Sequence, residues 1–301
     1  MNETRRGAIF GASAYLLWGV FPLYFPLLKP AGSIEVLAHR VVWSLVVVTV
    51  LVQVTRKWAG VRAVVADRGK LIRLTAAAMF LAVNWGVYIY GVNSGRVVET
   101  SLGYFINPLV TVMLGVLVLR ERLRPVQYAA LGVAFVAVVF LSIQNGRPPW
   151  IALILAFSFG TYGLLKKTAV VGALEGLTVE TAALAPLALV FLVGLQVSGN
   201  STLGSHGPGH TALLAATGLI TAIPLLFFGA AASRVPLTTL GVLQYLAPTM
   251  QFLIGVLVLH EALGLARLLG FCLVWVALAA FTADLLTQRR RGPRVAVAEP
   301  V

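Results

Sequence analysis

The chain has 301 residues, of which 59% are hydrophobic and only 11% are charged, and its mean hydropathy is +0.92. Soluble domains carry about 25% charged residues, so this composition excludes a soluble globular protein. The formal net charge of +13 does not indicate binding to nucleic acid, because the basic residues lie between hydrophobic segments and at the chain ends, as orientation signals do in membrane proteins.

Ten segments of the chain are apolar over the length, about 20 residues, that a helix needs to cross a bilayer. Backbone polar groups in hydrocarbon must bond within their own segment, so each segment is predicted to be a transmembrane helix. The long charge-free run from Thr181 to Ser233 is divided by residues 198–210, which contain Gly, Pro and polar side chains. In chain order, the predicted helices cover residues 7–28, 34–55, 71–93, 97–119, 124–144, 149–166, 174–197, 210–232, 236–259 and 265–287.

The basic residues favour one side of the membrane. With both termini in the cytoplasm, 18 of the 23 Lys and Arg side chains lie on the cytoplasmic side, 4 lie on the other side, and Arg40 lies inside the second helix. Cytoplasmic loops are enriched in Lys and Arg, so this distribution predicts a multi-pass protein of the inner or plasma membrane with both termini cytoplasmic. Residues 288–301 are predicted to form a disordered, basic cytoplasmic tail.

An internal repeat relates the two halves of the chain. The segments GVLVLRERL (115–123) and GVLVLHEAL (255–263) agree at seven of nine positions with an offset of 140 residues. Further matches run collinearly through four helices, which favours gene duplication over chance recurrence of Leu, Val and Gly. They predict an all-α membrane fold of ten helices, with one five-helix unit in residues 1–144 and a second in residues 149–287. Because five is odd, the second unit would be inverted in the membrane, and inverted repeats are a transporter architecture.

Eight stretches spread over nearly the whole chain carry a family resemblance, namely AYLLWGVFPLYF (14–25), EVLAHRVVWS (35–44), NWGVYIYGVN (84–93), ETSLGYFINPL (99–109), SFGTYGLLKK (158–167), GLTVET (176–181), IPLLFFGAAASRVPLTTLG (223–241) and LQYLAPTMQF (243–252). In these stretches the chain resembles the RarD-type branch of the EamA transporters, within the drug/metabolite transporter (DMT) superfamily. The resemblance implies ten transmembrane helices and the export or uptake of small organic molecules, without implying a particular substrate. The chain departs from the family pattern at Phe25-Pro26, where members often carry a lysine.

Ionisable side chains at membrane depth are costly, so they are candidates for function. Arg40 lies about 9 Å inside its predicted helix, at 1.5 Å per residue. It could reach the outer surface, form a structural ion pair or contact the substrate. Glu99, near the outer start of the fourth helix, is its expected partner, and the pair could act as a gate. Glu180, the repeat mate of Arg40, is expected on the inner side, where Lys166 and Lys167 are candidate partners and where it could take part in coupling.

Aromatic and amide side chains on the third, fourth, sixth and ninth helices are expected to line a central substrate pathway. Some of the rings could instead belong to the interfacial belt, and the amides could bond neighbouring helices. Together with Arg40, the expected pathway residues are Trp85, Tyr88, Tyr104, Asn107, Tyr162, Gln244 and Tyr245. Four prolines are expected to bend their helices, either at the pathway or as purely structural kinks. They are Pro22, Pro108, Pro224 and Pro248.

Other classes of protein are less consistent with the sequence. An intramembrane enzyme would need clustered His, Cys, Asp or Glu, but the four histidines are scattered and no GxSxG, HExxH or P-loop motif is present. No catalytic residue, cofactor or metal site is therefore expected, and Glu121 and Glu261 are expected to anchor loops. A channel or a sensory membrane protein is the main alternative to a transporter.

The expected partners are a small-molecule substrate and the lipid bilayer. The sequence contains no ATP-binding segment, so transport would be driven by an ion or solute gradient, and the identity of a coupling ion is left open. A monomer and a homodimer both fit the sequence.

Overall fold

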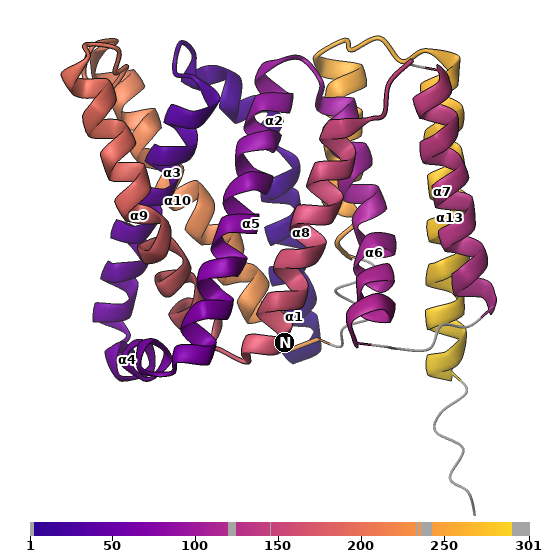
Figure 1. The fold of residues 1–301 in the computed structure, drawn as a ribbon, viewed down its shortest axis with the longest axis horizontal. Helices are drawn as coiled ribbons and strands as arrows, with labels where there is room; N and C mark the ends of the chain where they lie inside the picture. Colours follow the sequence, from indigo (N-terminus) through magenta and orange to yellow (C-terminus); the bar gives the residue numbers. More distant parts are fainter. Residues whose placement is uncertain (1–2, 120–124, 145, 233, 236–242, 291–301) are drawn as a thin grey trace, which may run out of the picture.

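The structure is a computed structural model that describes residues 3–119, 125–144, 146–232, 234–235 and 243–290 (Figure 1). Its main body is a bundle of helices that run side by side. In chain order the elements are α1 (Glu3–Gly19), α2 (Phe21–Tyr24), the 3-10 helix η1 (Phe25–Leu28), α3 (Ser33–Val54), α4 (Trp58–Ala66), α5 (Arg68–Asn93), α6 (Val97–Leu119), α7 (Pro125–Gln144), α8 (Trp150–Ala169), α9 (Ala173–Val197), α10 (Gly207–Ala232), α12 (Leu246–Leu253), the π-helix η2 (Ile254–Val258) and α13 (Leu265–Arg290).

Eight helical segments in the described part of the chain are long and apolar enough to cross a membrane. Two shorter apolar segments, Trp150–Lys166 and Leu246–Val258, lie where the sixth and ninth helices are predicted. The chain is therefore an all-helical, multi-span membrane protein, as predicted. Residues 236–242 of the predicted ninth helix and residues 291–301 of the predicted tail lie outside the described residues, whereas α13 continues to Arg290, beyond its predicted end.

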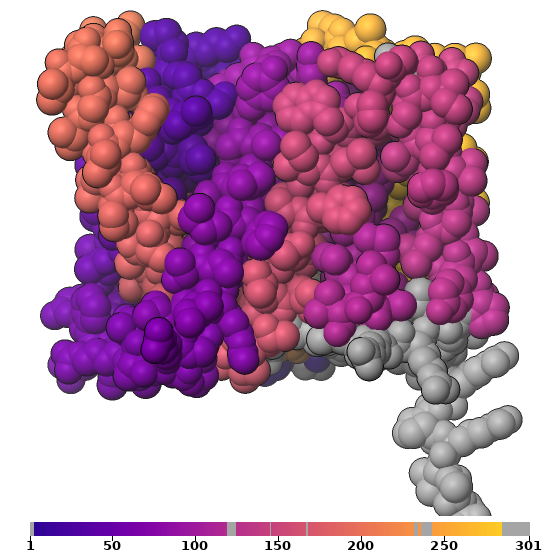
Figure 2. Space-filling view, in the orientation of Figure 1, coloured from indigo at the N-terminus to yellow at the C-terminus, as the bar shows by residue number. Residues whose placement is uncertain are grey.

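Large apolar side chains face outward from the bundle. Val190 of α9 and Phe135 of α7 are 74% and 69% exposed, respectively. These two helices lie at opposite edges of the face that Figure 2 shows. In water such exposure would be unfavourable, but it suits helices whose outer surfaces contact lipid.

The first predicted helix is interrupted near its C-terminal end. α1 ends at Gly19, Val20 forms a turn, and the chain continues as α2 and then η1. Pro22 and Pro26 occupy the second positions of α2 and η1. Proline has no N–H to donate within a helix, so it is favoured near a helix start and explains why one long helix does not form here.

The other three prolines that the sequence singles out lie in different surroundings. Pro108 and Pro224 lie inside α6 and α10, and each leaves the carbonyl four residues earlier without its usual helical donor. Pro248 lies in the first turn of α12, where the missing N–H has no intrahelical partner to lose. A bend of the helix at each of these positions stays a prediction.

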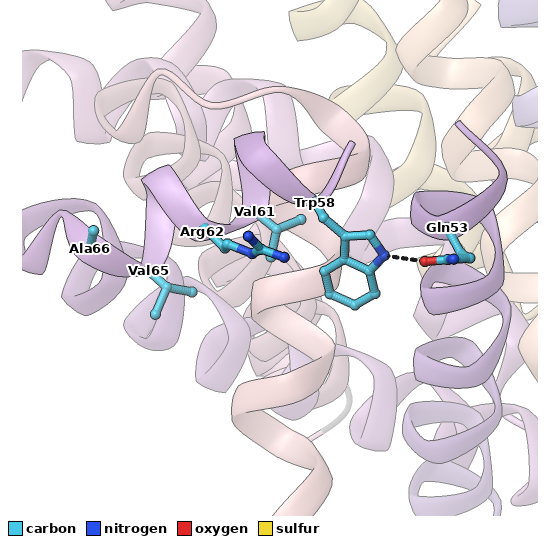
Figure 3. Close-up of a pocket in the computed structure, with 6 residues that line it drawn as sticks. All are labelled: Gln53, Trp58, Val61, Arg62, Val65 and Ala66. Carbon is cyan, nitrogen blue, oxygen red and sulfur yellow. Dashed lines mark hydrogen bonds between the residues drawn. The ribbon is translucent and has the colours of Figure 1, made fainter. Parts of the chain in front are cut away.

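The segment between α3 and α5 contains a helix that the sequence analysis did not predict. α4 turns one apolar face toward the bundle, where Val61 and Val64 are buried against residues of α3, α5 and α9. At its start the indole N–H of Trp58 donates a 2.6 Å hydrogen bond to Oε1 of Gln53 (Figure 3). Gln53, Trp58 and Val61 border an open hollow of about 670 Å³. Gln53 lies 13 residues, or about 20 Å, along α3 from Arg40, so this hollow is remote from that arginine.

Glu261 anchors a loop, as the sequence predicts. Its carboxylate accepts the backbone N–H groups of Val97 and Val98, at 2.5 and 2.9 Å, in the first turn of α6. The first N–H groups of a helix have no intrahelical partner, and the positive end of the helix dipole favours an anion there. The sequence predicts the same role for Glu121, but this residue lies outside the described residues.

Close helix contacts set the arrangement around α3. This helix packs against α9 and α10, while α8 packs against α5 and α6, and α7 pairs with α13 (Figure 1). Glycines allow some of these approaches. A Cβ on Gly103 of α6 would lie 2.7 Å from the carbonyl oxygen of Ala152 on α8, and one on Gly218 of α10 would overlap the backbone of Trp43 on α3. Small residues of this kind let membrane helices pack backbone to backbone.

Candidate functional site

Arg40 lies inside the bundle, with only 3% of its surface exposed. Its Nε–H donates a 2.7 Å hydrogen bond to Oγ1 of Thr221 on α10. The guanidinium carbon lies 4.0 Å from the centre of the Trp85 ring on α5, and 5.4 and 5.8 Å from the ring centres of Phe21 and Phe25. Aromatic faces attract cations at these distances, so the rings replace part of the hydration that the guanidinium has lost.

Two tyrosines extend this set of rings. The rings of Tyr88 and Tyr104 contact each other with centres 5.6 Å apart. The Tyr88 ring also packs edge-on against Phe25, at 5.9 Å between centres. We refer to this set as the Arg40 site, and it consists of Phe21, Phe25, Arg40, Trp85, Tyr88, Tyr104 and Thr221.

The two tyrosine hydroxyls differ in their partners. The Tyr104 hydroxyl donates to Oδ1 of Asn84 at 3.0 Å, and Asn84 in turn donates from Nδ2 to the Leu155 carbonyl at 3.0 Å and to Oγ of Ser158 at 3.1 Å. Tyr104 is thus fixed by a network that joins α5, α6 and α8. The hydroxyl of Tyr88, by contrast, is buried and has no hydrogen-bond partner among the described residues.

The predicted pairing of Arg40 with Glu99 is not the arrangement in this structure. Within the described part of the chain, no carboxylate lies within 4.0 Å of the Arg40 guanidinium. Glu99 instead accepts the backbone N–H of Ile151 at 3.2 Å, in the first turn of α8. A carboxylate is favourable at the start of a helix, where N–H groups are free. The predicted depth and membrane side of the two residues do not reveal that they face different helices.

Rings connect the Arg40 site to a second buried charge. Tyr104 contacts Phe159, and Phe159 contacts Tyr162, with ring centres 6.1 and 5.7 Å apart. Beyond them, Nζ of Lys166 lies 2.6 Å from Oε1 of Glu180, which is only 1% exposed. The Tyr162 hydroxyl lies 3.5 Å from the other oxygen of Glu180. Lys166 is one of the two partners that the sequence suggests for Glu180, and nothing is described of the Lys167 side chain.

Three of the predicted pathway residues lie apart from these two charges. Asn107 accepts a 2.9 Å hydrogen bond from Thr111 within α6. Tyr245 packs against the apolar cluster shared by α6, α7 and α13. The structure therefore brings Arg40, Trp85, Tyr88 and Tyr104 together, and a pathway role for Asn107, Gln244 and Tyr245 stays a prediction.

Sequence reasoning missed Thr221, Phe21 and Phe25 as parts of the site. Thr221 also donates to the Thr217 carbonyl at 2.8 Å, which is common behaviour for a threonine in any membrane helix. Phenylalanine is equally ordinary in a membrane helix, so neither residue type carries a signal in the sequence. No group of three or more His, Cys, Asp or Glu side chains that could hold a metal ion occurs among the residues that the structure describes.

Arg40 and Glu99 are expected to contribute independently to stability, because they bond different helices. In a double-mutant cycle of Arg40→Gln and Glu99→Gln, read by thermal unfolding of the purified protein, the coupling should stay below about 0.5 kcal/mol. A coupling free energy well above that value would mean that the two side chains pair in a conformation populated in solution.

Known proteins resemble the chain over most of its length. The profile of the EamA-like transporter family matches residues 5–143. Protein RarD of Streptomyces exfoliatus is 55% identical over 99% of this chain and 95% of its own, and Protein RarD of Escherichia coli (strain K12) is 39% identical over 96% and 98%. An uncharacterized transporter of Pseudomonas aeruginosa is 42% identical over 96% and 97%. A solved crystal structure with 19% identity superposes with a TM-score of 0.60, over 94% of this chain and 98% of that one, which shows the fold alone.

Proposed function

The chain belongs to the RarD branch of the EamA-like transporter family, and from this premise we propose that it carries small organic metabolites or drugs by alternating access, as a secondary-active permease or exporter. Membership makes it a multi-pass transporter and not an enzyme. The proposal goes further, because it specifies a carrier with a substrate site inside the bundle.

The observation that carries this proposal is the burial of Arg40 between segments from both halves of the chain. Its helix, α3, and its aromatic neighbours on α2, η1 and α5 belong to the first half, whereas Thr221 on α10 belongs to the second. A charged group deep in a membrane protein is costly, so its presence points to a function. A site made by both halves would open to either side of the membrane when the halves move relative to each other.

We further infer that the two halves, residues 1–144 and 149–287, are inverted repeats. Arg40 is the eighth residue of α3 and Glu180 the eighth residue of α9, so the second helix of each half has a buried charged side chain at its eighth position. The third helices, α5 and α10, each have 26 residues. The family match ends at residue 143, which supports the proposed boundary.

The inverted arrangement makes a prediction about topology. A reporter fused after Gly146 should lie outside the cytoplasm, and one fused after Thr287 should lie inside it, because five helices precede the first fusion and ten precede the second. Alkaline phosphatase should therefore be active only in the first fusion, and green fluorescent protein should fluoresce only in the second. The opposite pattern would contradict the orientation, and the same side for both would contradict the inversion.

Transport itself can be tested before the substrate is identified. Small molecules inside and outside cells that lack the gene should be compared with those of cells that overexpress it, by mass spectrometry. A carrier predicts a limited set of solutes whose distribution across the membrane shifts in opposite directions in the two strains. Identical distributions in both strains, over the whole set of detected solutes, would contradict the proposal.

A further inference from the structure

Among the described residues, no negatively charged acceptor lies within 4.0 Å of the Arg40 guanidinium. A guanidinium carries five N–H donors, and among the described residues only Thr221 accepts one of them, from Nε. Tyr88 is 3% exposed, and its hydroxyl also has no partner in the described part of the chain. The Tyr88 ring and the guanidinium both pack against Phe25, at 5.9 and 5.8 Å from its ring centre. Buried polar groups are normally bonded, so an unbonded hydroxyl and a buried guanidinium without a charged partner, packed against one ring, indicate a missing ligand.

The chemistry of the missing ligand follows from these donors. The terminal N–H groups of an arginine form a planar fork that fits a carboxylate or another oxyanion, and a hydroxyl can donate a further bond to the same anion. A cationic ligand would be repelled by Arg40, and a neutral amide would leave its charge uncompensated. The rings of Phe21, Phe25 and Trp85 lie 4.0 to 5.8 Å from the guanidinium carbon, and such rings suit an apolar or aromatic body next to the anionic group.

We propose that Arg40 and Tyr88 bind the anionic group of the transported molecule, and that the substrates are small organic anions with an apolar body. This proposal rests on the proposed transport function. The alternative is that Arg40 has only a structural role. That role would not require an unbonded Tyr88 hydroxyl in the same site. An anionic lipid headgroup has the same chemistry, but the residues of the site are enclosed within the bundle, which favours a soluble anion.

Binding can be measured on the purified full-length protein in phosphatidylcholine nanodiscs. The probes are monocarboxylates from acetate to indole-3-acetate, each compared with its neutral primary amide of nearly the same shape. The acids should raise the melting temperature of the wild-type protein with saturable dependence on concentration, and the amides should not. Arg40→Gln should abolish this response, whereas Arg147→Gln, the same change at an exposed arginine between α7 and α8, should preserve it.

Tyr88→Phe keeps the test valid if Arg40→Gln does not fold. This variant loses an oxygen that bonds no described residue, so the unliganded protein should melt at the wild-type temperature. Its affinity for the acids should fall about tenfold, as expected for the loss of one hydrogen bond to a charged group. Unchanged affinity in Tyr88→Phe, or equal stabilisation by acids and amides, would overturn the proposal.

Three further outcomes separate this proposal from the alternatives. If phosphatidylglycerol in the nanodisc competes with the acids, the site binds lipid headgroups and the substrate role is overturned. If the wild-type protein transports neutral solutes and Arg40→Gln transports them equally well, the anion site is overturned while the carrier proposal stands. If the wild-type protein transports nothing from a cell extract into liposomes, the proposed function itself fails.

Discussion

Gly218→Leu is expected to prevent the chain from folding to a stable bundle, and Gly218→Ala to destabilise it by about 3 kcal/mol. A Cβ at this position would overlap the carbonyl carbon and oxygen of Trp43, so relief requires α10 to move away from α3. Backbone atoms cannot rotate aside as the end of a flexible side chain can. Because α3 carries Arg40 and α10 carries Thr221, the same displacement would break their 2.7 Å hydrogen bond.

Melting of the detergent-purified variants, followed by fluorescence-detected size exclusion, measures this effect. Gly132→Ala in α7 is the matched control, since a Cβ at Gly132 meets no atom within 4 Å. It should leave the melting temperature unchanged or raise it slightly, because alanine is the better helix former. If Gly218→Ala melts like this control, the close contact between α3 and α10 does not exist.

The Lys166–Glu180 pair should behave as one unit in stability. Replacement of Glu180 alone by Leu leaves an uncompensated ammonium beside apolar helices, and is expected to cost about 3 kcal/mol. Lys166→Met alone should cost at least as much, because Glu180 is the more deeply buried partner, with 1% of its side chain exposed against 26% for Lys166. The double variant should recover most of the loss, since removing both charges also removes their desolvation penalty.

Thermal unfolding of the four proteins in a double-mutant cycle gives the coupling free energy, expected to exceed about 1 kcal/mol. The control is the pair formed by Lys57, directly before α4, and Glu175, in the first turn of α9. Its charges are 3.3 Å apart, but half of the Lys57 side chain is exposed, so its coupling should stay below about 1 kcal/mol. Additive effects of the Lys166 and Glu180 substitutions would show that their contact does not stabilise the folded protein.

The extents of most membrane helices were predictable because hydropathy changes sharply at their ends. The fourth predicted helix, 97–119, has the bounds of α6, and the second differs from α3 by one residue at each end. α4 was not predicted, because nine residues are too few for a helix that spans the membrane. Its stability comes from Val61 and Val64 packing on neighbouring helices, and such contacts are not visible in a hydropathy pattern.

The candidate site was predictable only in part. Arg40, Trp85, Tyr88 and Tyr104 were identified because charged and aromatic-polar groups are unusual at membrane depth. The partner of Arg40 was not, since sequence position gives the depth of a side chain but not the helix that it faces. Glu99 and Arg40 are both on the outer side by this reasoning, yet one bonds the start of α8 and the other bonds Thr221 on α10. Such pairings depend on contacts between helices that lie far apart in the sequence.

The central claim is that the protein is a carrier whose site is exposed to one side of the membrane at a time. Counterflow in liposomes tests it most directly, with excess unlabelled substrate inside and a trace of the labelled compound outside. The substrate is the solute identified by comparing deletion and overexpressing cells. A carrier predicts that the label transiently accumulates inside above its equilibrium level. The reason is that a site that releases unlabelled substrate outside can bind labelled compound there and carry it inward. Monotonic entry to equilibrium without an overshoot would contradict the claim.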